Sequence, residues 1–147
     1  MPFETFLIRL GISMLAGFLI GLERELKNKD AGLRTHIMVS LGATVYLLVS
    51  FELLEEGSGD VTRIVSQIVT GIGFLGAGVI LQKRGDIRGL TTAATIWVTA
   101  AVGCLAGLGL IWETTVTTVA IIIVNAALHF LENKFIDPDK KKKSETP

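Results

Sequence analysis

The stretch Gly71–Ala94, GIGFLGAGVILQKRGDIRGLTTAA, decides the fold of this chain. Its first eight residues contain four glycines, within an apolar run that extends from Ile64 to Leu81. In water, each glycine in a helix costs roughly 1 kcal/mol relative to alanine. In a bilayer, glycines instead let helices approach closely, and such packing holds membrane helices together. The sequence therefore predicts that residues 64–81 form the central helix of a membrane bundle, packed on two sides. Its predicted helix-packing glycines are Gly71, Gly73, Gly76 and Gly78.

A competing interpretation of these glycines is a nucleotide site, because Gly71, Gly73 and Gly76 fit the G-x-G-x-x-G fingerprint. That fingerprint requires a preceding strand, a following soluble helix and an acidic residue about 20 residues further on. Here the following helix would stop at Lys83, and the position for the acidic residue falls in the uncharged stretch 90–96. The membrane helix is the favoured interpretation.

The composition indicates an all-α, polytopic membrane protein. Half of the 147 residues are hydrophobic, and the formal net charge is zero. Charged residues gather in short clusters, separated by apolar runs of about 17 to 21 residues, which is the length that spans a bilayer. Residues 1–133 are predicted to form one transmembrane domain. Residues 134–147 form a basic tail that is too short and too charged to fold alone. The single cysteine, Cys104, allows no disulfide within the chain.

Five transmembrane helices are predicted, over residues 3–22, 35–54, 64–81, 90–110 and 114–131. Basic residues collect in the first and third connections and in the tail. By contrast, the second connection has only Arg63 and the fourth has none. Because basic residues mark the cytoplasmic side, the N-terminus is predicted outside and the C-terminus in the cytoplasm.

Two of the predicted helices carry a face of small or hydroxyl-bearing residues. In the first, Gly17 and Gly21 follow Ser13 at helical spacing, and Arg24 continues the same side. In the fourth, a threonine face comprises Thr92, Thr95, Thr99, Gly103 and Ala106. Gly17, Gly21 and Gly103 are therefore predicted to pack against neighbouring helices. The threonine face would bond to another helix, or alternatively line a hydrated cavity.

Three other polar side chains lie in or near these segments. Arg9 is close enough to the start of the first segment to extend to the interface. His36 begins the second segment and is predicted to be interfacial. Tyr46 lies near mid-depth, so its hydroxyl is expected to need a partner inside the bundle.

The second connection is acidic and offers weak candidates for a divalent cation site. Mg²⁺ and Ca²⁺ favour oxygen ligands, and the carboxylates available are Glu52, Glu55, Glu56 and Asp60. A solvated acidic loop without bound metal is the favoured interpretation, so no cofactor is predicted.

Catalytic chemistry is not indicated by this sequence. No Asp, Glu, Lys or Arg lies in the middle of a predicted span, where carriers and proton-coupled pumps usually place ionisable groups. No nucleophile with a base and no metal-ligand spacing is evident, so an enzyme is not expected. What remains is a charged group on the predicted cytoplasmic side, in which Glu23 and Asp86 could pair with the arginines. Its members are Glu23, Arg24, Arg34, Asp86 and Arg88. Ordinary positive-inside charge is the equally weighted alternative.

The sequence resembles the MgtC/SapB family of bacterial inner-membrane proteins. The resemblance rests on Gly21–Ala43, GLERELKNKDAGLRTHIMVSLGA, and on Val69–Gly109, which includes GIGFLGAG and RGLTTAAT. It implies an integral inner-membrane protein associated with growth at low magnesium and, in pathogens, with survival inside host cells. Family members are thought to act on other membrane systems, including ATP synthase, rather than to carry magnesium. By the motif match, the functional candidates are Glu23, Arg24, Arg34, Arg88 and Thr91.

The chain departs from virulence-type members of that family in two ways. Some of them have Asn at the position of Thr91, and they continue into a soluble cytoplasmic domain, whereas this chain stops at Pro147. A short member without that domain is therefore expected.

Two functions remain open from the sequence. The first is a regulatory protein that responds to low magnesium or envelope stress. The second is a small oligomeric Mg²⁺ or cation transporter or channel, with the threonine face lining a path. The expected partners are the lipid bilayer, further copies of the chain (for example as a dimer) and other membrane proteins such as ATP synthase. No nucleic acid is expected.

Overall fold

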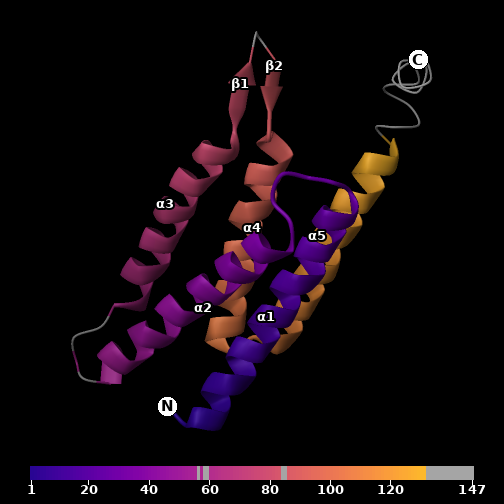
Figure 1. Cartoon of the computed structure of the whole chain (residues 1–147). Coiled ribbons are helices and arrows are strands. Elements are labelled where there is room, and N and C mark those ends of the chain that lie inside the picture. Colours follow the sequence, from indigo (N-terminus) through magenta and orange to yellow (C-terminus); the bar gives the residue numbers. More distant parts are fainter. Residues whose placement is uncertain (56, 58–59, 84–85, 132–147) are drawn as a thin grey trace, which may run out of the picture.

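A computed structural model of the chain describes residues 1–55, 57, 60–83 and 86–131. The described part is a helical bundle with one small β-hairpin at one end (Figure 1). Its elements are α1 (Phe3–Leu26), α2 (Leu33–Glu55), α3 (Val61–Val79), β1 (Leu81–Lys83), β2 (Asp86–Arg88), α4 (Leu90–Leu108) and α5 (Ile111–Leu131). The hairpin lies between α3 and α4, and its strands pair antiparallel, with Leu81 opposite Arg88. The end that carries the hairpin and the α1–α2 loop is called the hairpin end below.

The all-helical membrane class is confirmed. The four helices α1 to α4 are each long and apolar enough to cross a bilayer. In α5 the apolar stretch Ile111–Ala127 is shorter. The chain is therefore a multi-pass membrane protein, while a fifth span and the orientation of the termini stay predictions.

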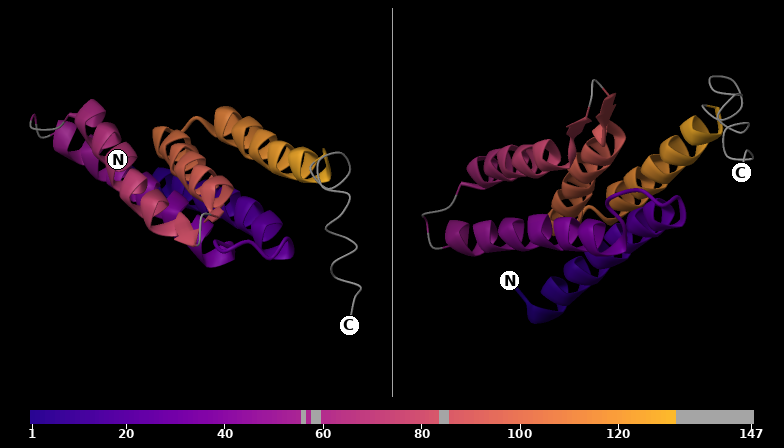
Figure 2. Two further views of the ribbon diagram at one scale, coloured as in Figure 1. Left: turned by 90° about the horizontal axis from the view of Figure 1, so that it is seen from above. Right: turned by 45° about the horizontal axis from the view of Figure 1, so that its top comes forward.

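Helix α4, not α3, is the centre of the bundle. It contacts each of the other four helices, and α3 and α5 lie on opposite sides of it (Figure 2). In the 18-residue apolar stretch of α4, 56% of the residues are buried, whereas in that of α3 only 11% are buried. The prediction that α3 is central is wrong for a single chain, because glycine-rich apolar composition does not show which helix the others surround.

Close helix contacts occur at glycines of α1 and α4. A Cβ atom on Gly17 would lie 2.7 Å from the carbonyl oxygen of His36, and one on Gly21 would lie 2.7 Å from the Cα of Leu33. A Cβ on Gly103 would lie 3.0 Å from the Cβ of Ala43. These three positions therefore let α1 and α4 approach α2 at backbone distance.

Most of the glycines of α3 have no such neighbour. Only Gly76 faces another helix, where an added Cβ would lie 3.6 Å from that of Ala93 in α4. Gly71, Gly73 and Gly78 have nothing within 4 Å. All four glycines lie within one continuous helix that follows α2 rather than a strand. That geometry does not fit the dinucleotide fingerprint.

Candidate functional site

A seam of buried polar side chains runs between α1, α2 and α4. None of these side chains is more than 4% exposed. Buried polar groups are tolerated in such a core when they are hydrogen-bonded to one another or to the backbone. The polar seam consists of Ser13, Arg24, His36, Ser40, Thr44, Thr92, Thr95 and Thr99.

Arg24 begins the polar seam at the hairpin end. Only 2% exposed, it donates from Nη2 to Thr92 Oγ1 at 3.1 Å. Its Nε has no hydrogen-bond partner among the described residues. The sequence places Arg24 correctly on the packed side of α1 but suggests Glu23 as its partner. The structure instead gives it a hydroxyl of α4, because the side of α1 that carries Gly17 and Gly21 faces inwards.

His36 and Thr99 connect α2 to α4 in the middle of the seam. His36 Nδ1 lies 2.9 Å from Thr99 Oγ1, and that hydroxyl donates to the carbonyl oxygen of Thr95 at 2.7 Å. Because a hydroxyl has one proton, Thr99 must accept from His36, whose Nδ1 therefore carries hydrogen. Nε2 is buried without a partner in the described part of the chain. His36 is fully buried between helices, while its predicted place at the membrane interface stays a prediction.

Hydroxyl groups of α1 and α2 continue the seam towards the opposite end. Ser40 donates to the carbonyl oxygen of Ser13 at 3.0 Å, and the two hydroxyl oxygens are 2.9 Å apart. Thr44 Oγ1 lies 2.7 Å from both Ser13 Oγ and the carbonyl oxygen of Gly103. These contacts join three helices, and the absence of a side chain at Gly103 leaves its carbonyl accessible.

Arg9 lies near the far end of α4. Its Nη1 donates to the carbonyl oxygen of Gly107 at 2.7 Å, and its guanidinium carbon is 5.7 Å from the centre of the Phe51 ring. A cation beside the last carbonyls of a helix is favourable. Arg9 therefore binds the C-terminus of α4. The sequence predicts only that its side chain extends to the interface and does not predict this contact.

The threonine face is packed rather than open. Thr92, Thr95 and Thr99 are buried and bonded as described, while Trp97, on the other side of α4, is half exposed. Within the described residues, Thr92 and Thr99 accept hydrogen bonds from Arg24 of α1 and His36 of α2. The hydroxyls of Thr95 and Thr99 donate to carbonyl oxygens of α4 itself, not to those of another helix.

A second polar cluster joins α1 to α5 at the hairpin end. Lys27 Nζ lies 2.5 Å from Glu23 Oε1 and donates to the carbonyl oxygen of Asn125 at 3.1 Å. Asn125 Nδ2 also donates weakly to Glu23 Oε2 at 3.4 Å. Lys27 and Glu23 form an ion pair at the end of α1. Glu23 thus pairs with Lys27 instead of an arginine, and Lys27 is not a freely solvated charge.

The other functional candidates are not gathered with Arg24. Arg34, Arg88 and Thr91 are exposed, at the start of α2, in β2 and in the first turn of α4 respectively. Asp86 belongs to β2, but its side chain lies outside the described residues, so its predicted pairing stays a prediction. The hairpin end therefore has a buried contact, Arg24–Thr92, beneath exposed candidates. The sequence alone does not place Thr92 among the functional candidates. Its position on the threonine face of the fourth predicted helix is the signal that it packs against another helix.

The acidic candidates are not assembled into a metal site where they are described. The N-terminal ammonium of Met1 lies 3.0 Å from Glu52 Oε1 and 3.9 Å from Glu55 Oε2. Asp60 caps α3, and hydrogen bonds from Thr62 and Arg63 hold the pKa of its carboxyl below the ordinary value. Among the described residues, no three His, Cys, Asp or Glu are placed to hold a metal. Glu56 lies outside them.

Comparison with known proteins extends over most of this structure. The model of the MgtC family matches residues 10–134. Protein MgtC of Brucella abortus (strain 2308) is 50% identical over 116 residues, which are 79% of this chain and 48% of the relative. Protein MgtC of Salmonella typhimurium (strain 14028s) is 44% identical over 123 residues, 84% of this chain and 52% of the relative. A Synechocystis protein is 41% identical over 87% of this chain.

The chain thus spans about half the length of the curated relatives that it matches. No solved structure matches it. The matched residues include α1 to α4 almost completely, with the polar seam and the exposed arginines. On this evidence the chain belongs to the MgtC family.

Proposed function

We propose that this protein is a non-enzymatic inner-membrane regulator of the MgtC type. It serves adaptation to low magnesium or envelope stress by acting on other membrane proteins, of which ATP synthase is one example. In a pathogenic host this role would extend to survival inside host cells. The observation that carries the proposal is the closed packing of the polar seam in a chain of this family.

That packing disfavours the alternative of a cation transporter. Mg²⁺ gives up its water reluctantly and keeps several water molecules when it binds. A path for it therefore requires a wide, hydrated passage. In the described residues the buried polar faces of α2 and α4 meet in the polar seam, where hydrogen bonds close them in.

The proposed contact surface is the hairpin end, which we place in the cytoplasm. Arg34 and Arg88 are exposed there, and arginine's planar guanidinium binds carboxylates or other anions through two parallel hydrogen bonds. The Arg24–Thr92 bond holds the start of α4 against α1, and therefore positions Arg88, two residues before α4 begins. A partner protein's acidic groups suit this surface.

Rescue of growth at low magnesium tests the proposal. In a strain that lacks its own family member, Arg24→Lys and Arg88→Lys should each lose rescue at matched membrane levels, because Lys keeps the charge but not the fork geometry. Lys29→Ala is the control and should rescue like the parent. ATP-driven proton pumping in inverted vesicles from the same strains reports on ATP synthase. Full rescue by both lysine variants would contradict the proposal.

A further inference from the structure

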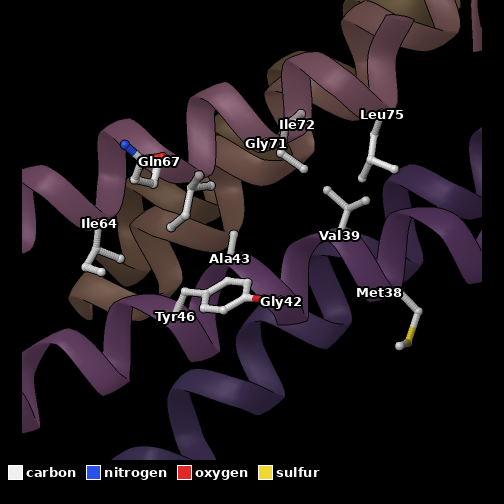
Figure 3. Close-up of a pocket in the computed structure, with 11 residues that line it drawn as sticks. Met38, Val39, Gly42, Ala43, Tyr46, Ile64, Gln67, Gly71, Ile72 and Leu75 are labelled. Carbon is white, nitrogen blue, oxygen red and sulfur yellow. The ribbon is translucent and has the colours of Figure 1, made fainter. Parts of the chain in front are cut away.

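A groove between α2 and α3 is left open by the packing of the described residues. It has a volume of about 580 Å³ and is lined by side chains of both helices (Figure 3). Both helices are long and apolar enough to cross a membrane. The groove therefore lies at membrane depth, where water does not fill it.

Two polar side chains in the groove have no partner within the described residues. Tyr46 on α2 is 64% exposed, and Gln67 on α3 is exposed as well. Tyr46 precedes Glu55 by nine residues and Gln67 follows Val61 by six, so both lie about 9–14 Å inside the same end of the bundle. At that depth an unpaired amide or hydroxyl is costly. The groove therefore calls for an occupant that can form hydrogen bonds.

We infer that this groove and the Gln67 side of α3 form the contact with a second copy of this chain. An acyl chain has neither donor nor acceptor for the amide of Gln67, and the backbone of a neighbouring helix is already hydrogen-bonded within itself. The same amide of a second copy supplies both. Two copies inserted with the same topology relate by a two-fold axis along the membrane normal, which places identical residues at equal depth. A primary amide is both donor and acceptor. Two Gln67 side chains can therefore bond reciprocally across that axis.

The backbone around Gln67 permits the approach that this pairing requires. Gly71 lies one turn further along α3, also lines the groove and has nothing within 4 Å. Without a side chain there, two α3 helices can come close enough for interhelical hydrogen bonds. Within one chain, α3 is anchored to α4 through Gly76 and Ala93, and it is the least buried of the four long apolar helices. A second copy would cover its free side and give α3 packing on two sides.

Disulfide crosslinking in membranes tests the contact directly. The parent for this test carries Cys104→Ala, so that an introduced cysteine is the only thiol. Gln67→Cys should form a crosslinked dimer on mild oxidation. Val69→Cys, at nearly the same depth but on the other side of α3, should stay monomeric. Absence of the Gln67→Cys dimer, or equal crosslinking of both variants, would overturn the inference.

The amide itself is tested in liposomes by counting subunits with single-molecule photobleaching. Gln67→Leu should raise the dimer dissociation constant roughly threefold or more, as expected for loss of interhelical hydrogen bonds. Gln67→Asn keeps an amide and should retain much of the dimer. Circular dichroism must show parental helicity for each variant. If Gln67→Leu dimerises as well as the parent, or the parent is monomeric, the groove holds lipid or another protein and the inference is wrong.

Discussion

At the scale of single residues, the hydrogen-bond partner of Arg24 separates the charged candidates into a buried structural residue and exposed ones. A buried guanidinium is held by a neutral hydroxyl of Thr92, while the adjacent carboxylate of Glu23 pairs with Lys27. Arg24 is thus a residue that positions α4, while Arg34 and Arg88 are exposed at the same end of the bundle.

Removing the hydroxyl of Thr92 should destabilise the protein more than removing that of Thr91. Thr92→Val leaves the buried Arg24 without its acceptor, which costs about 1.5–3 kcal/mol for a charged hydrogen bond. Thr91→Val changes an exposed side chain and should stay within about 0.5 kcal/mol of the parent. The free energy of unfolding in mixed micelles measures both. Equal losses would show that the Arg24–Thr92 bond contributes nothing particular.

Asp60 should make the first turn of α3 sensitive to acid. Its carboxylate accepts hydrogen bonds from Thr62 and Arg63, which lowers its pKa in the folded protein. The stabilisation is therefore present above the unfolded pKa and is lost as pH falls through the lower, folded value.

Amide exchange in the first turn of α3, followed against pH, measures this effect. Protection should fall in the acid range for the parent. Asp60→Asn is the matched control, because its amide oxygen caps without titrating, and its protection should not change over the same range. A pH-independent parent would contradict the assigned cap.

At the scale of helices, hydropathy predicts the elements well but not their neighbours. The predicted spans lie within a few residues of the observed helices, because apolar runs of membrane length have few other interpretations. The faces of α1 and α4 are also recognisable, since Gly17 and Thr99 each belong to a periodic small or polar side. Helix α3 differs: its glycines lie on two sides, Gly71 and Gly78 on one and Gly73 and Gly76 on the other, so the glycine pattern cannot show which side another helix covers. The burial of His36 depends on tertiary contacts that no local pattern contains. The same holds for the partner of Arg24, which is Thr92 and not Glu23.

Glycine positions therefore should differ sharply in their tolerance of a methyl group. Gly17→Ala places a Cβ 2.7 Å from the His36 carbonyl oxygen and should cost about 1–3 kcal/mol, as overpacking does. Gly73→Ala meets no atom within 4 Å and should be tolerated, although the sequence predicts Gly73 as a helix-packing position. Unfolding free energies of the two variants check the contrast. A stable Gly17→Ala would mean that α1 and α2 are not in close contact.

At the scale of the whole molecule, orientation is a prediction that follows from loop charge. In a Cys104→Ala background, a cysteine in place of the exposed Glu113 should react from outside the cell with an impermeant thiol reagent. A cysteine in place of the exposed Asp30, in the basic α1–α2 loop, should react only after the membrane is opened. Labelling of the Asp30 position in intact cells would contradict the proposed cytoplasmic hairpin end.

We propose that the bundle is closed to ions and acts through contacts with other membrane proteins. The measurement that tests it most directly is Mg²⁺ flux into liposomes that contain the purified full chain, reported by a trapped Mg²⁺-sensitive dye. A known Mg²⁺ channel, reconstituted at the same protein density, is the positive control. Flux no greater than in protein-free liposomes is the predicted result, with the same protein still rescuing growth at low magnesium. Mg²⁺ entry that rises with protein density would show instead that the protein conducts the ion.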